Sequence, residues 1–178
     1  MDAFESVVSM LLRCDGYWTI PSFKVELTKE EKREIGKHSA PRWELDLVAY
    51  HGLTNKVLAV ECKSLLDSTG VMFRGGQFEP PKRYKLFVDD ILRRVVLNRL
   101  ARQLEETQAC RPGPEVQLCL AAGRIANQSD RQEMNEHFAA YGWQLFDREW
   151  IKTRLERAAK SSYENDVSFV VMKLLLRG

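Results

Sequence analysis

The spacing of apolar residues predicts a helix at the start of the chain and then three strands. Over residues 3–13 the apolar positions recur at helical spacing and form one stripe: Phe4, Val7, Val8 and Leu11. Segments rich in Val, Leu and aromatic residues follow, and they predict strands over residues 17–27, 44–50 and 57–63. Pro21 indicates that the first of these strands is an edge strand or contains a bulge.

The second half of the chain predicts more helices than strands. A long helix is expected over residues 85–107, with a buried stripe formed by Val88, Ile91, Leu92, Val95, Val96 and Leu100. The apolar run 116–122 predicts a buried strand, parallel to the one that ends at Lys63 because a crossover helix connects them. A helix to about Tyr141, a short strand and another helix complete the pattern, over residues 129–141, 143–146 and 147–159. Residues 168–176 are apolar on every side, and periodicity does not separate strand from helix there.

These elements predict an α/β fold, with three layers and a mixed central sheet. The 178 residues suffice for one domain, and 44% hydrophobic residues can fill a continuous core. We therefore expect a single domain over residues 1–178, with a core of about 3–146 and a C-terminal helical extension of about 147–178. The charged stretch 28–41 predicts a short solvated helix, with Thr28 as its cap and Glu31 completing a capping box. His38, in the same stretch, is interpreted as inert rather than catalytic.

The strands 44–50 and 57–63 are joined by HGLTNK, whose Gly52 and Asn55 favour a turn. A hairpin is the simplest connection between them. If Tyr50 pairs with Val57, the residue numbers of every antiparallel pair add up to 107. Three further pairs follow from that register: Val48 with Ala59, Asp46 with Glu61, and Glu44 with Lys63. Two carboxylates and an amine therefore converge.

Strand alternation separates polar from apolar side chains in this hairpin. It places Asp46, Glu61 and Lys63 on one face, opposite Leu45, Leu47, Leu58, Val60 and Cys62. Carboxylates about 5 Å apart across two strands repel each other unless a cation lies between them. Oxygen ligands suit Mg²⁺ or Mn²⁺, with the Lys63 charge beside the metal. Such a site can lower the pKa of a bound water and stabilise the charge that develops on a phosphodiester.

Asp46, fifteen positions before the Glu61-Cys62-Lys63 triplet, resembles the motif of the PD-(D/E)xK nuclease superfamily, which has the restriction-endonuclease-like fold. The resemblance includes a preceding amphipathic helix with an acidic residue, here Glu5, and a long helix after the lysine strand. It spans roughly residues 4–146. Leu45 replaces the proline of the motif, at a position that varies in the family and takes no part in the chemistry.

The resemblance implies a three-layer α/β/α domain that cleaves nucleic acid with Mg²⁺, which Mn²⁺ can replace. Asp46 and Glu61 would hold the metal, Lys63 would orient or activate the attacking water, and Glu5 would be an outer-shell or supporting acid. DNA is favoured over RNA as the substrate, with endonucleolytic cleavage. A homodimer is compatible with this, because two sites most easily cut both strands. The family also includes members that have lost activity, so a binding module without catalysis is the alternative.

Other interpretations of these residues stay open. The acids and Lys63 could form ordinary ion pairs on a solvated sheet face, although apolar neighbours on the same face, such as Val48 and Ala59, argue that it is covered. Glu5 could equally be a surface glutamate that the helix dipole favours in the first turn. A protein-interaction subunit is a third class of function, which predicts neither metal nor nucleic-acid binding.

Positive charge is concentrated after the proposed site. The whole chain carries a net charge of +2, but residues 74–102 hold eight basic residues against three acidic ones. Candidate nucleic-acid contacts here and at the start of the hairpin are Arg42, Arg74, Lys82, Arg83, Arg94 and Arg102. The Gly- and Pro-rich stretch 64–84 predicts either a flap over the substrate or a disordered insertion.

The cysteines and the N-terminus indicate a cytoplasmic location. The four cysteines show no CxxC pair and no zinc-like spacing to histidine, so free thiols in a reducing compartment are expected. Asp2 and Glu5 interrupt any signal sequence, and no apolar run approaches the ~18 residues of a membrane span, so no membrane partner is expected.

Overall fold

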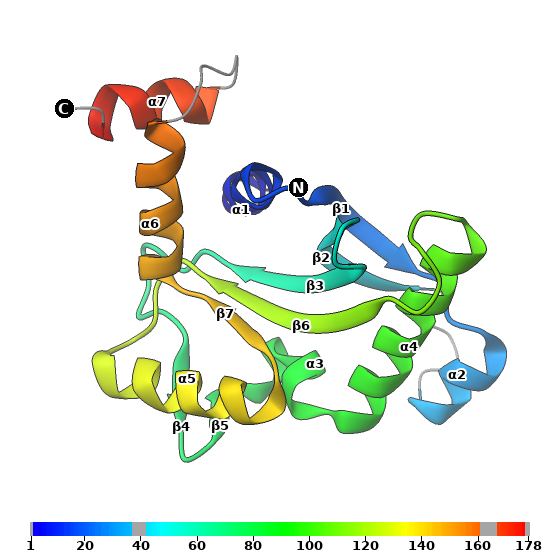
Figure 1. Ribbon diagram of the computed structural model, residues 1–178. Coiled ribbons are helices and arrows are strands. Elements are labelled where there is room, and N and C mark those ends of the chain that lie inside the picture. Colours follow the sequence, from blue (N-terminus) through cyan, green and yellow to red (C-terminus); the bar gives the residue numbers. More distant parts are fainter. Residues whose placement is uncertain (1, 37–41, 161–166, 177–178) are drawn as a thin grey trace.

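A five-stranded mixed sheet is the centre of the structure (Figure 1). The computed structural model describes residues 2–36, 42–160 and 167–176. The strands lie in the order β1-β2-β3-β6-β7, with the bounds β1 (Trp18–Val25), β2 (Trp43–His51), β3 (Lys56–Lys63), β6 (Glu115–Ala122) and β7 (Gln144–Phe146). β1, β2 and β3 are antiparallel, whereas β6 and β7 run parallel to β3. The predicted α/β class, the mixed sheet and the edge position of β1 are confirmed.

Helices lie on both faces of this sheet (Figure 1). The helix α1 (Ala3–Cys14) lies on one face, and the other face carries α3 (Lys85–Val88), α4 (Asp90–Glu106) and α5 (Gln128–Tyr141). Two helices follow β7 and lie toward α1, namely α6 (Arg148–Ala159) and α7 (Val167–Leu176). The remaining elements are short: α2 (Lys29–Glu34), β4 (Met72–Arg74), β5 (Gln77–Glu79) and the 3₁₀ helix η1 (Pro81–Arg83).

Each face of the sheet has its own apolar cluster, because side chains alternate along the strands. Val8 and Leu12 of α1 pack against Leu47, Leu58 and Val60. The larger cluster, on the opposite face, joins strand residues to α3, α4, α5 and the β4–β5 hairpin, and includes Val48, Val57, Ala59, Phe78, Val96 and Phe138. The acidic residues of the hairpin therefore lie in a sheet that is covered on both sides.

The predicted hairpin register is confirmed from Leu47–Val60 to His51–Lys56, whose residue numbers add up to 107. The regular pairing ends there, so Asp46 and Glu61 are not a backbone pair of the ladder. The prediction that Leu45 shares a face with Leu47 is wrong, because Leu45 packs in the cluster of Val48. The alternation shifts at Asp46, and Ser22, which falls opposite Asp46 between the pairs Pro21–Leu47 and Phe23–Leu45, has a left-handed φ of 49°.

The predicted helix 85–107 is two helices, α3 and α4, separated at Asp89. The Asp89 carboxylate accepts a hydrogen bond from the amide of Leu92 (2.9 Å) and so begins a new helix at Asp90. Val88 and Ile91, predicted as buried, are 45% and 51% exposed, so the buried stripe is narrower than predicted. Leu92, Val95, Val96 and Leu100 are buried as predicted.

The other helix predictions are confirmed closely. Thr28 and Glu31 form the expected capping box of α2. Gly142 ends α5 in the left-handed conformation at φ 68°. Residues 168–176, for which strand and helix stayed open, form most of α7. His38 lies outside the described residues.

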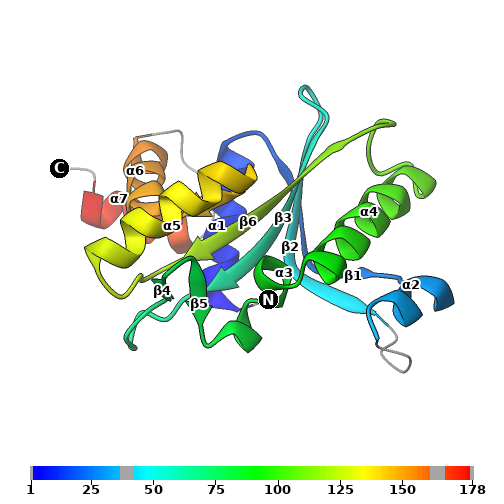
Figure 2. The same ribbon diagram turned by 90° about the horizontal axis from the view of Figure 1, so that it is seen from below.

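The stretch 64–84 is ordered and packed, so its interpretation as a disordered insertion is wrong. It contains the β4–β5 hairpin, whose Phe73 and Phe78 are buried against the larger cluster. Val71 forms a β-bridge with Ile125, in the segment that follows β6. The hairpin and the start of α5 lie beyond the carboxyl ends of β3 and β6 (Figure 2).

The described part of the chain contains no helix with the length and apolar character needed to cross a membrane. None of the four cysteines, which all lie in the described residues, forms a disulfide, and Cys62 and Cys119 are buried.

Candidate functional site

Asp46, Glu61 and Lys63, here called the triad, converge at the carboxyl end of β3 as predicted, although the predicted pairs Asp46–Glu61 and Glu44–Lys63 are not part of the strand ladder. The Nζ atom of Lys63 lies 3.5 Å from Oδ2 of Asp46 and 3.5 Å from Oε2 of Glu61. The same ammonium donates a hydrogen bond to the carbonyl oxygen of Cys62 (3.1 Å). Three oxygen atoms from two strands therefore surround one cationic group.

The backbone of β3 fixes the Asp46 carboxylate. The amide nitrogen of Cys62 donates a hydrogen bond to Oδ2 of Asp46 at 2.7 Å. The regular backbone pairing of β2 with β3 ends at Leu47, the residue next to Asp46, and this side-chain contact continues the link between the two strands beyond it. The shift in alternation at Asp46 thus turns a side chain of β2 into an acceptor for β3.

Glu61 is held in an unfavourable environment for its charge. Its side chain is only 16% exposed, and burial, followed by repulsion from Asp46, raises its pKa to about 7. Lys63 opposes this rise but does not cancel it. At neutral pH the site therefore contains a carboxylate that an additional cation would stabilise.

Lys63 keeps its charge in this site. Burial lowers the pKa of its amine, but the carboxylates of Glu61 and Asp46 together outweigh burial, so the pKa is raised overall. The ammonium is therefore retained at neutral pH, when Glu61 is about half ionised.

Glu5 is part of the capping box of α1, and its role as a supporting acid stays a prediction. Its carboxylate accepts a hydrogen bond from the amide of Asp2 (3.0 Å) in the capping box of α1. Its charge also raises the pKa of Glu61, as the last of the causes after burial, and it has the same effect on the Cys62 thiol. The helix cap therefore places a third acid near the triad.

The donor set of the triad fits a hard divalent cation in its chemistry. Two carboxylates and a backbone carbonyl already converge on the Lys63 ammonium, and Mg²⁺ typically takes one or two carboxylates and keeps several waters. Among residues 2–36, 42–160 and 167–176, no group of three or more His, Cys, Asp or Glu side chains has the arrangement of a metal site. Asp46 and Glu61 would therefore share a metal with water or substrate oxygens.

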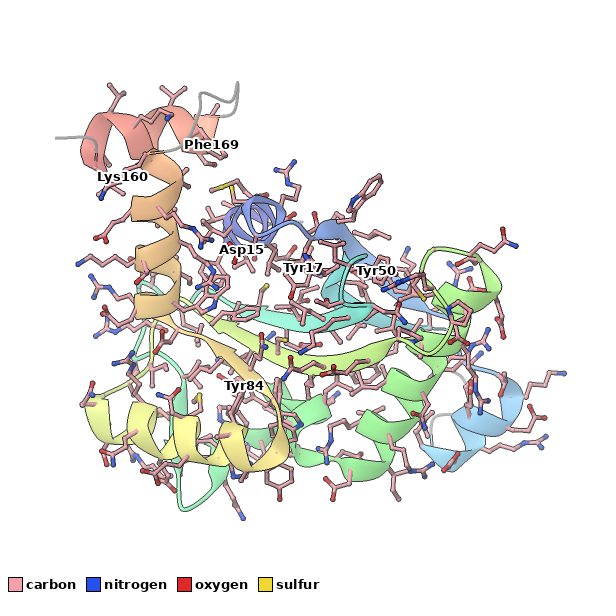
Figure 3. The ribbon with its side chains drawn as sticks, in the orientation of Figure 1. Asp15, Tyr17, Tyr50, Tyr84, Lys160 and Phe169 are labelled. Carbon is pink, nitrogen blue, oxygen red and sulfur yellow. The ribbon has the colours of Figure 1, made fainter. Side chains whose placement is uncertain are left out.

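Tyr84 is a residue near the triad that the sequence did not point out. It is 3% exposed and stacks on Phe78, with 4.3 Å between the ring centroids. Burial raises the pKa of its hydroxyl, while the charges of Lys63 and Arg83 lower it. Figure 3 shows Tyr84 on the side of the sheet opposite to α1. An aromatic residue between Lys82-Arg83 and Lys85, after two prolines, was the only signal in the sequence.

The six basic residues proposed for nucleic-acid contact do not form one cluster around the triad. Arg42 pairs with Glu26 (3.4 Å), and Arg94, in α4, pairs with Glu34 of α2. Arg74, in β4, lies 3.7 Å from the buried carboxylate of Asp130. Lys82 and Arg83 are exposed in η1, directly before Tyr84, and Arg102 is exposed near the end of α4. Of the six, Lys82 and Arg83 are the pair that directly precedes Tyr84, the residue whose pKa burial raises and the charge of Lys63 lowers.

Compared with known proteins, the chain matches no family model, no curated protein and no solved structure.

Proposed function

We propose that this protein is a metal-dependent phosphodiesterase that cleaves nucleic acid, with DNA as its substrate and an endonucleolytic mode of cleavage. The observation that supports this most is the convergence of Asp46, Glu61 and Lys63, with 3.5 Å between the Lys63 ammonium and each carboxylate. The order of these residues along β2 and β3, and the sheet with helices on both faces, agree with a restriction-endonuclease-like arrangement.

Each residue of the triad has a role that follows from its environment. Asp46 and Glu61 would hold Mg²⁺, and Mn²⁺ could replace it because both prefer oxygen ligands. When bound, such a metal lowers the pKa of a coordinated water and offsets the charge on the phosphoryl oxygens. Lys63 is charged and held by three oxygens, so it can orient the attacking water and stabilise the developing negative charge. Glu5 supports the negative potential that attracts the cation.

A second candidate is a nucleic-acid-binding module that has no catalytic activity. The observation in its favour is that Lys63 already pairs with both carboxylates, so an ion pair could satisfy the acids without a metal. The exposed Lys82 and Arg83 would then contribute to binding alone.

The decisive experiment is a cleavage assay on supercoiled, linear, branched and single-stranded substrates of DNA and RNA, with Mg²⁺, Mn²⁺ or EDTA. The parent protein is compared with Lys63→Ala and with Lys56→Ala. Lys56 is a matched control, because it lies in the same strand, has the same 24% side-chain exposure, and also pairs with a carboxylate, Glu115, at 3.1 Å.

Metal-dependent cleavage of DNA that is lost in Lys63→Ala and kept in Lys56→Ala supports the nuclease. Cleavage that persists in Lys63→Ala would show that the triad is not the active site. Salt-dependent binding without cleavage under any condition would support the binding module instead.

A further inference from the structure

A cleft of about 860 Å³ lies beyond the carboxyl ends of β6 and β7. One wall is formed by α1, and the others by the segment after β3, the segment after β6 and the first turns of α5 and α6. The side chains that matter below are Phe4, Leu66, Arg124, Gln128, Arg148 and Ile151. Figure 2 shows that β3 and β6 point to the same side, where the crevice beyond parallel strands is the usual place for a ligand.

The cleft begins beside the end of β3, directly after the triad residue Lys63. The amide of Gly123, which lines the cleft, donates a hydrogen bond to the carbonyl of Lys63 (3.0 Å). A Cβ on Gly123 would lie 2.4 Å from the carbonyl oxygen of Ser64, so only glycine permits this close approach. Phe4, which also lines the cleft, is next to Glu5 in α1. A chain bound at the triad could therefore continue directly into the cleft.

Two arginines in the cleft are available to an anionic ligand. Arg124 and Arg148 are exposed, and neither forms an ion pair within the part of the chain that the structure describes. The third, Arg131, is already paired, because its Nε lies 2.6 Å from the buried carboxylate of Asp147. Glu149 is the other acidic side chain that lines the cleft, and it forms no ion pair within the described residues. With two unpaired arginines against one unpaired glutamate, the lining of the cleft carries a net positive charge.

The cleft also offers apolar surface and an amide. Phe4, Leu66 and Ile151 form part of its lining, and Leu66 is 59% exposed although it is a large apolar residue. Gln128 contributes a side-chain amide that can both donate and accept hydrogen bonds. Apolar and aromatic surface, an amide and two arginines together match the base and the phosphates of a nucleotide.

We propose that this cleft binds an unpaired nucleotide of the substrate, beside the phosphate that is cut. This inference rests on the proposed function and specifies its substrate as DNA with a single-stranded segment at the cleavage site, such as an overhang or a branch. The volume falls within the ~300–1,000 Å³ of pockets that enclose a molecule of nucleotide size. Paired bases in a duplex are stacked inside the helix and cannot contact Phe4 or Leu66.

The test is a binding measurement in EDTA, so that no cleavage occurs. Fluorescently labelled DNA with a single-stranded overhang is compared with a blunt duplex of the same length, over a range of salt concentrations. The variant Arg124→Ala/Arg148→Ala removes the two free charges. Lys29→Ala/Arg33→Ala is the matched control, since it removes the same net charge from α2, at the other end of the sheet (Figure 1).

We expect the cleft variant to bind the overhang about tenfold more weakly, with the slope of log K against log salt reduced by about 1.4 for two lost single-strand contacts. Its affinity for the blunt duplex should change less than about twofold, and the control should discriminate as the parent does. Equal losses on both substrates, or no loss, would overturn the inference. If the parent cleaves DNA and the cleft variant binds and cleaves as the parent does, the nuclease proposal stands and the cleft inference is rejected. If the parent binds the overhang specifically but cleaves nothing, the cleft inference stands and the nuclease proposal is rejected.

Discussion

The amide nitrogen of Cys62 donates a hydrogen bond to the carboxylate of Asp46 across 2.7 Å, at the point where the regular pairing of β2 and β3 ends. A side chain of one strand thus completes the hydrogen bonding of the next. This contact holds Asp46 beside Glu61 and Lys63, and it gives Asp46 a structural role that is separate from its charge.

The two roles of Asp46 can be separated by two substitutions. Asp46→Asn keeps an oxygen that can accept from Cys62, so its unfolding free energy should stay near that of the parent. Asp46→Ala leaves that amide without its partner, which should cost about 1–3 kcal/mol in urea unfolding. Both variants should lose DNA cleavage, because neither has the negative charge that a metal needs. Cleavage by Asp46→Asn at the parent rate would contradict this assignment.

Glu61 should destabilise the folded protein at neutral and alkaline pH. Its pKa rises from 4.5 to about 7 on folding, so the folded state binds the proton more tightly and stability falls as pH rises between these values. Below pH 4.5 the group is protonated in both states and has no such cost. The shift corresponds to a cost on the order of 3 kcal/mol above pH 7.

We therefore expect Glu61→Gln to be more stable than the parent at pH 8 by up to about 3 kcal/mol, and equal to it near pH 4. Urea unfolding in EDTA at several pH values measures this difference without bound metal. A stability difference that does not change between pH 4 and pH 8 would show that Glu61 is not held in the strained environment described above. DNA cleavage should be lost although stability improves.

Much of the triad could be predicted from sequence because a hairpin register follows from simple rules. One turn sequence and strict strand alternation fixed the pairs from Leu47 to His51, and they brought Asp46 and Glu61 to the same end of the hairpin. The local departure at Asp46 could not be predicted in this way. It depends on the neighbouring strand, where Ser22 adopts a left-handed conformation opposite Asp46, and no pattern within β2 reports that.

A local helix cap and contacts between distant segments explain the other differences. Asp89 interrupts an otherwise continuous helical pattern because its side chain caps α4, and both capped and continuous helices are compatible with the local sequence. Tyr84 comes near Lys63 only because a packed hairpin and η1 return the chain to the sheet. The cleft that contains Arg124 and Arg148 was not predicted. These residues follow β6 and β7, which are separated in the chain by α5 and become neighbours only in the folded sheet.

Metal binding should depend on pH through Glu61. A proton on this carboxylate competes with Mg²⁺, and with a pKa of about 7 the group is mostly protonated at pH 6 and mostly ionised at pH 8. We expect the affinity for Mg²⁺ to be roughly tenfold higher at pH 8 than at pH 6 in isothermal titration calorimetry. Proton release on binding, measured in two buffers of different ionisation enthalpy, should accompany this change at pH 7. Equal affinity at both pH values would mean that Glu61 is not a ligand.

Asp130 should control the order of the β4–β5 hairpin. Its side chain is almost fully buried and accepts a hydrogen bond from the amide of Phe73 at 3.2 Å, and it lies 3.7 Å from Nε of Arg74. Asp130→Ala leaves a buried amide without a partner, which should cost about 1–3 kcal/mol of unfolding free energy. Asp130→Asn keeps an acceptor for Phe73 and should cost less.

Hydrogen exchange distinguishes a local effect from a global one. In Asp130→Ala the amide of Phe73 should exchange faster than in the parent, whereas amides in the centre of β3, such as Leu58, should lose protection only as far as global stability falls. Because the hairpin leads through η1 to Tyr84, the same variant should also weaken DNA binding at Lys82 and Arg83. Unchanged exchange at Phe73 would show that the aromatic packing of Phe73 on Phe78, rather than the Asp130 carboxylate, holds the hairpin in place.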